Sequence, residues 1–188
     1  MSWLVLYARS RQVPVSAAAV ALVTLAVCVL HSPGTVDPGM AVLVLTANVA
    51  AGSVGLGGRD VVLERTAAIR WVPRRAAHVL LIGGCAGAAL LAARATGVDL
   101  APAELVVRGS AGLVGLAALG AALCGAQFAW TLPTGWLALT LLVPARGGTV
   151  GEVLSWMIFP AGTTASSWTA AVLLVTGTAV YAMAGPRR

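Results

Sequence analysis

Charged residues are scarce in this chain of 188 residues, because Asp, Glu, Lys and Arg together make up only 10% of it. Soluble domains average about 25%. Hydrophobic residues reach 59%, which excludes a disordered chain and would leave a soluble domain with too much exposed apolar surface. The composition therefore indicates an integral membrane protein.

Lysine is absent, aromatic residues amount to 5%, and only three cysteines occur. Cys28, Cys85 and Cys124 stand in separate apolar stretches without a CxxC spacing, so neither a disulfide framework nor a zinc site is indicated. We expect them to be small buried hydrophobic residues. The 22 glycines suit helices that pack closely in lipid.

Six segments are apolar and long enough to cross a bilayer, which takes about 20 helical residues. They are separated by short stretches rich in Pro, Gly or charge. We therefore predict an all-α, polytopic membrane helix bundle, forming one transmembrane domain over residues 1–188. The expected spans are residues 13–30, 39–56, 76–96, 104–124, 128–145 and 167–184.

Two further segments are expected to lie at the membrane surface. Residues 1–12 place Trp3, Leu4 and Tyr7 on one face of a short interfacial helix. Residues 150–160 are apolar, but 11 helical residues rise only about 16 Å, too little for a core of about 30 Å. They predict a re-entrant outer segment before the last span, with Trp156 at headgroup depth; a seventh, short span is the alternative.

The arginines predict the orientation. With both termini inside, nine of them lie on the inner side, and only Arg94, Arg108 and Arg146 lie outside. Basic residues accumulate on the cytoplasmic side, so this orientation is favoured. Arg94 and Arg108 are expected to snorkel to the outer surface, near Asp99 and Glu104.

Small residues recur at four-residue spacing, which allows helix backbones to approach closely. In a chain so rich in Ala and Gly, chance is the alternative explanation for any one pair. The pairs are Gly83 with Gly87, Ala111 with Gly115, and Ala121 with Gly125.

Groups for membrane chemistry are few. His31 and His78 fall at opposite ends of their spans, and no acidic residue falls in mid-span, which counts against proton relays. We expect no catalytic residue, no metal site and no cofactor in this chain. Three polar residues within the spans, Thr46, Asn48 and Thr131, are candidates for a substrate path or for interhelical hydrogen bonds.

The densest charged feature is the stretch 57–75, with five arginines and two acids. It predicts a cytoplasmic helix with Asp60 in its first turn, where a negative charge suits the helix dipole. Pro73 is expected to end this element, and Arg74 and Arg75 to anchor the next span. The simpler alternative is that any inner loop collects arginines.

Leu63-Glu64-Arg65-Thr66, the following Pro73-Arg74-Arg75, six spans and a re-entrant segment together resemble a bacterial permease of the ABC-2 type. This resemblance implies the membrane subunit of an ABC exporter in the bacterial cytoplasmic membrane. The loop would be its coupling helix, and ATP and Mg would bind in a separate ATPase. The implied contacts with that partner are Asp60, Glu64, Arg65 and Arg70.

The same resemblance implies a second permease half, either another copy or a sister subunit, and both termini in the cytoplasm. A cavity poor in fixed charge would suit an apolar or amphipathic cargo. Two alternatives stay open: a small channel, carrier or assembly factor that works without an ATPase, and a membrane-embedded enzyme.

Overall fold

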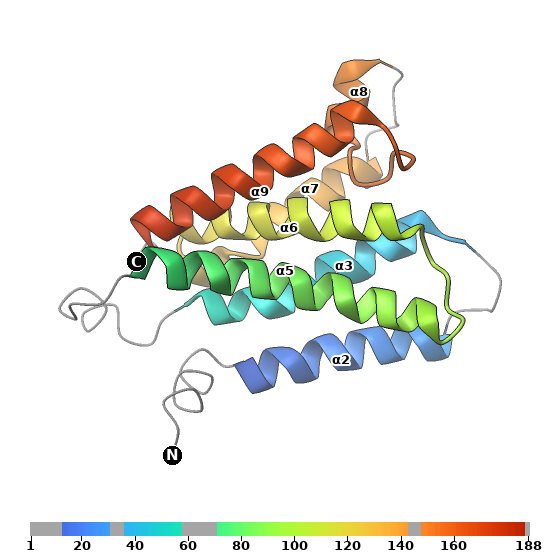
Figure 1. Cartoon of the computed structure of the whole chain (residues 1–188), viewed down its shortest axis with the longest axis horizontal. Coiled ribbons are helices and arrows are strands. Elements are labelled where there is room, and N and C mark those ends of the chain that lie inside the picture. Colours follow the sequence, from blue (N-terminus) through green and yellow to red (C-terminus); the bar gives the residue numbers. More distant parts are fainter. Residues whose placement is uncertain (1–12, 31–35, 58–70, 143–147, 187–188) are drawn as a thin grey trace.

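A computed structural model describes residues 13–30, 36–57, 71–142 and 148–186. These residues form seven α-helices and two short 3-10 helices, and no strand occurs among them, as the all-α prediction expects (Figure 1). The elements are α2 (Val13–Leu30), α3 (Pro38–Ser53), η1 (Val54–Leu56), α5 (Trp71–Ala95), α6 (Ala103–Leu123), η2 (Ala126–Phe128), α7 (Thr131–Leu142), α8 (Thr149–Leu154) and α9 (Thr164–Ala184).

Helix α6 is the centre of the bundle, packed most extensively on α9 and also on α5, α3 and α7. Helices α2, α3, α5, α6, α7 and α9 alternate in direction along the chain, so α6 and α9 run the same way, and α2 lies at the outside (Figure 1). As a result, one end of the bundle holds the first residues of α2 and α5 and the last residues of η1 and α9. We call this the loop end, because the segment 58–70 joins η1 to α5; α8 lies at the far end.

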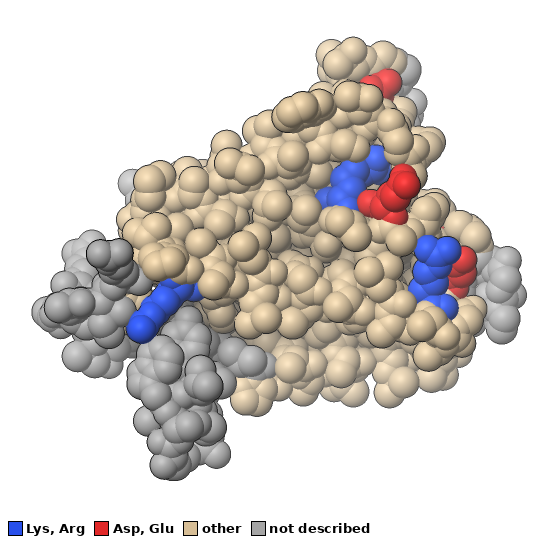
Figure 2. Space-filling model, viewed as in Figure 1, with Lys and Arg blue, Asp and Glu red and all other residues tan. Residues whose placement is uncertain are grey.

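Four helical segments are long and apolar enough to cross a membrane: Pro38–Leu56, α5, α6 and α9. A shorter apolar helix covers Pro14–Val29. The chain is therefore a helical membrane protein. On the face seen in Figure 2, charged side chains gather at the two ends of the bundle and leave the surface between them uncharged.

Two predicted spans differ most from the structure. Helix α5 begins at Trp71, so Pro73 lies in its first turn and does not end a separate element. A proline is tolerated there, since the first amides of a helix have no intrahelical partner. Helix α7 has only 12 residues, which rise about 18 Å, against a predicted span over 128–145; residues 143–147 lie outside the described part of the chain.

The closest helix contacts depend on glycine. A methyl group on Gly115 would collide with the backbone of Leu173, and one on Gly177 with the carbonyl of Gly115. On the other side of α6, a methyl group on Gly83 would stand 2.7 Å from Val114. The expected small-residue contacts thus occur in α5 and α6, but Gly125 lies beyond the end of α6, with a φ of 105°.

The segment before α9 differs from the prediction in the length of its helix and in the burial of Trp156. Helix α8 ends at Leu154, short of the expected 150–160, and turns follow it. Trp156 was expected at headgroup depth, yet it is fully buried, with its ring against Gly112. The expectation of buried cysteines is also wrong for two of them, since Cys85 and Cys124 are exposed.

Candidate functional site

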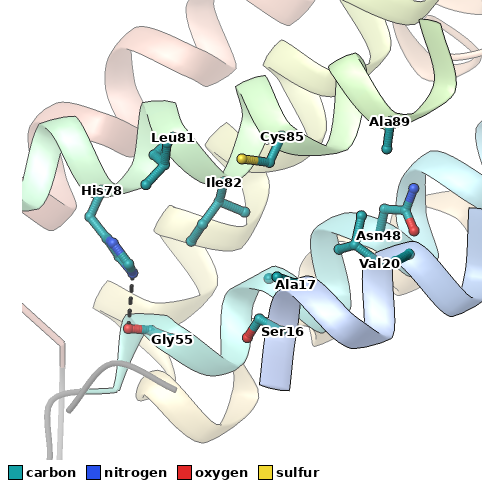
Figure 3. Close-up of a pocket in the computed structure, with 12 residues that line it drawn as sticks. Ser16, Ala17, Val20, Asn48, Gly55, His78, Leu81, Ile82, Cys85 and Ala89 are labelled. Carbon is teal, nitrogen blue, oxygen red and sulfur yellow. Dashed lines mark hydrogen bonds between the residues drawn. The ribbon is translucent and has the colours of Figure 1, made fainter. Parts of the chain in front are cut away.

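A cavity of about 230 Å³ lies between α2, α3 and α5 (Figure 3). The residues that line the cavity include Ser16, Ala17 and Val20 of α2 and Asn48 of α3. The remaining helix, α5, contributes lining residues from His78 to Ala89. None of the described lining residues is Asp, Glu, Lys or Arg. The cavity is therefore mainly apolar, with a few polar atoms at defined places.

The sequence produces this cavity by helical spacing and by small residues. His78, Ile82, Cys85 and Ala89 recur every three or four residues along α5, so they share one face of the helix. Opposite them, α3 offers Gly52, where a methyl group would stand 2.6 Å from the Cγ2 atom of Ile82. Larger residues on α3 would close the space.

Asn48 is the central polar residue of the cavity. Its side chain is fully buried, and its Nδ2 donates a hydrogen bond of 3.1 Å to the Oγ1 of Thr24 on α2. Its Oδ1 has no hydrogen-bond partner among the described residues, and neither has the buried Oγ of Ser16. Two unsatisfied polar atoms thus belong to residues that line the same cavity.

The loop end of the bundle is fastened by hydrogen bonds to backbone carbonyls. His78 Nε2 donates to the carbonyl of Gly55 at 3.1 Å, and the hydroxyl of Tyr181 donates to that of Leu56 at 2.7 Å. Arg75 Nη1 donates to the carbonyl of Ala182 at 3.4 Å. These bonds tie η1 and the start of α5 to the end of α9.

We expect Tyr181→Phe to weaken this junction. The substitution removes the donor to Leu56 and leaves a buried carbonyl short of one partner, which costs about 1 kcal/mol of unfolding free energy. Thermal unfolding in detergent, followed by circular dichroism, measures the loss. Thr176→Val, which removes an exposed hydroxyl bonded only within α9, is the control and should shift the midpoint by less. Equal midpoints for Tyr181→Phe and wild type would contradict the junction.

Arg108 was predicted to snorkel, but it is 8% exposed and turns inward. Its Nη1 donates to the carbonyl of Pro160 at 3.1 Å, and its Nη2 donates to that of Phe159. The guanidinium thus holds the turns that follow α8. Arg94 behaves as expected, since it pairs with Asp99 at 3.2 Å on the surface.

Of the three residues predicted for a substrate path, only Asn48 lies at the cavity. Asn48 lines the cavity, whereas Thr46 donates to the carbonyl of Val42 within α3, and Thr131 donates to that of Phe128 at the start of α7. Arg74, expected in the loop, stands in α5 with its guanidinium 6.0 Å from the ring centre of Trp71. The four predicted coupling residues, Asp60, Glu64, Arg65 and Arg70, lie outside the described residues.

Sequence reasoning missed the role of Ser16 and the burial of His78. Helical spacing places His78 in line with Ile82 and Cys85, but only the rotation of α5 in the bundle shows that this face meets α2 and α3. Within the described ranges, no group of three or more His, Cys, Asp or Glu residues is placed to hold a metal ion.

Comparison of the chain with protein-family models, with characterised proteins and with solved structures finds no match. Its function is therefore inferred from its own charges, topology and cavity.

Proposed function

We propose that this chain is the permease subunit of an ABC-2-type exporter in a bacterial cytoplasmic membrane. It would cross the membrane six times, with both termini and the segment 58–70 in the cytoplasm. A separate ATPase subunit would bind and hydrolyse ATP with Mg, and a second permease half would complete the transporter.

The observation that carries this proposal is the fastening of the loop end. The segment 58–70 begins after η1 and returns at α5, and the carbonyls of Gly55 and Leu56 are bonded to α5 and α9. A displacement of that segment would therefore be passed to three helices together rather than absorbed at its base. A loop that couples an ATPase to membrane helices needs this property.

The charge distribution supports the same orientation. Five of the 12 arginines lie in residues 57–75. In the proposed six-span topology, nine of the 12 would fall on the side of the membrane that holds this stretch and both termini. Positive charge next to the ends of spans is retained in the cytoplasm. The loop end is then the end that an ATPase in the cytoplasm can reach.

The cavity indicates the cargo of the proposed permease. It lies beside the loop end, because Gly55 and His78 belong to both the cavity and the fastened base. Its apolar lining suits the apolar part of an apolar or amphipathic molecule. Movement of the base would change the shape of the cavity directly.

Co-purification tests the proposal. The tagged chain, extracted in mild detergent from its native host, should bring down an ATP-binding subunit. Glu64→Arg should reduce the amount recovered by about tenfold or more, because charge reversal in a protein interface costs several kcal/mol. Asp99→Arg reverses a charge in an exposed surface ion pair before α6 and should leave recovery unchanged.

Other outcomes would contradict it. If the chain purifies alone and an added ATPase subunit never binds, the permease assignment fails. Ion or solute flux through liposomes holding only this chain would favour a channel or carrier that needs no ATPase. Turnover of a lipid would favour a membrane enzyme.

A further inference from the structure

Two buried polar atoms point to a ligand in the cavity between α2, α3 and α5. Asn48 is 0% exposed, and its amide is satisfied at one end only, by Thr24. The Oγ of Ser16 is buried without a partner in the described structure. Buried polar atoms are rarely left unpaired, and in a dry apolar site a bound molecule can complete them.

The cavity opens sideways, towards the surface that meets lipid. Ala17 and Ala21 of α2 are exposed, and so are Leu81 and Cys85 of α5, although all four line the cavity. They stand in the uncharged part of their helices. From His78 to Ala89 the lining follows α5 for about 16 Å. A molecule dissolved in the bilayer can therefore reach the cavity without crossing water.

The polar atoms lie at two levels along this length. Ser16, Gly55 and His78 mark the level next to the loop end, whereas Asn48 lies deeper (Figure 3). The seven residues from Asn48 to Gly55 correspond to about 10 Å along α3 and the start of η1. Arg74 does not line the cavity, but it stands one turn before His78 on the same face of α5, towards the loop end.

The size of the cavity limits its occupant. A volume of about 230 Å³ exceeds the roughly 150 Å³ of an apolar cavity that takes up benzene. It has room for part of one hydrocarbon chain, not for a lipid with two chains. The level at the loop end then corresponds to the polar head group of the ligand. The deeper level corresponds to a second hydrogen-bonding group part of the way along the ligand's hydrocarbon chain.

We propose that the cavity binds a single-chain anionic amphiphile, such as a hydroxy fatty acid, taken up laterally from the bilayer. Its carboxylate lies at the loop end towards Arg74, and its mid-chain hydroxyl bonds to Asn48. This inference gives the proposed permease its substrate class and rests on that proposal for transport, whereas binding is a property of this chain alone.

Occlusion of the cavity tests the site. The full chain is placed in phosphatidylcholine nanodiscs, and saturable binding of a radiolabelled hydroxy fatty acid is measured, with empty nanodiscs as background. Leu81→Trp should weaken binding by about tenfold or more, because the indole fills the cavity. Leu80→Trp is the matched control: Leu80 is 53% exposed against 54% for Leu81, but only Leu81 lines the cavity.

Both positions are exposed, so neither variant should unfold the bundle, and size-exclusion profiles verify this. Binding that is equal in Leu81→Trp, Leu80→Trp and wild type would overturn the site. Loss of binding in Leu80→Trp as well as in Leu81→Trp would overturn it too, since the effect would not depend on the cavity.

Asn48→Leu tests the second polar level. Wild type should prefer the mid-chain hydroxy acid over the matched fatty acid about three- to tenfold, the usual contribution of one hydrogen bond. Asn48→Leu should reduce this ratio to about one and keep binding of the plain acid. Thr24→Val also removes the bond between α2 and α3 but leaves the Asn48 amide, so it should retain the preference.

An unchanged ratio in Asn48→Leu, or equal loss in Thr24→Val, would overturn the role of Asn48. These measurements need no ATPase, so they are independent of the permease proposal. Binding that persists when no ATPase associates would leave the site standing and remove the exporter. If an ATPase associates with the chain but the chain does not bind the probe, the exporter proposal stands and the binding site is excluded.

Discussion

Gly177→Ala is expected to destabilise the folded bundle strongly, with a loss of about 3 kcal/mol in unfolding free energy. The added methyl group would collide with the backbone carbonyl of Gly115, which lies in the middle of α6. A backbone atom in a packed helix cannot move aside as a flexible side chain can. Helices α6 and α9 form the most extensive contact in the described structure, so their separation would open the core.

Thermal unfolding in detergent and the size-exclusion profile measure this effect. Gly135→Ala is the matched control, because it makes the same substitution within α7, where nothing beyond the helix's own neighbouring backbone lies within 4 Å of the added carbon. That control should be neutral or stabilising by up to about 1 kcal/mol, since alanine favours helix. If both variants unfold at the wild-type temperature, the packing of α9 on α6 is wrong.

Arg108→Leu is expected to release the turns that follow α8 and to cost about 3 kcal/mol or more. The two carbonyls that accept from the guanidinium, those of Phe159 and Pro160, would lose charged donors, each of which contributes about 1.5–3 kcal/mol. Leucine fills part of the same volume, so lost packing is not the main cause. Arg108→Lys should recover only part of the loss, because one ammonium group cannot reproduce the planar fork of donors.

Amide hydrogen exchange locates this effect. Exchange should rise in residues 149–163 of Arg108→Leu and remain as in wild type along α5. Arg94→Gln is the control: it breaks the exposed pair with Asp99, which is worth at most about 1 kcal/mol, and should leave exchange in 149–163 unchanged. Protection of that segment equal to wild type in Arg108→Leu would show that the arginine does not hold it.

The positions of most helices were predictable from the sequence, because the length of an apolar run and the residues that form turns act locally. The predicted 13–30 is α2, and the predicted 104–124 differs from α6 by one residue at each end. The start of α5 was misplaced because Arg74 and Arg75 look like loop residues, although arginine is a good helix former. Positive charge predicts which side of the membrane a segment lies on, but it does not predict the conformation of the backbone.

The candidate site could not be predicted in full, since it depends on contacts between distant segments. The sequence by itself determined a membrane protein of helices, with its charge concentrated at their ends, because transfer into lipid depends on composition and length. Only the tertiary structure decided that Trp156 and Arg108 turn inward and that Asn48, Ser16 and His78 line one cavity. The rotation of each helix about its axis depends on which side chains fit between neighbours, and that fit is a property of the assembled bundle.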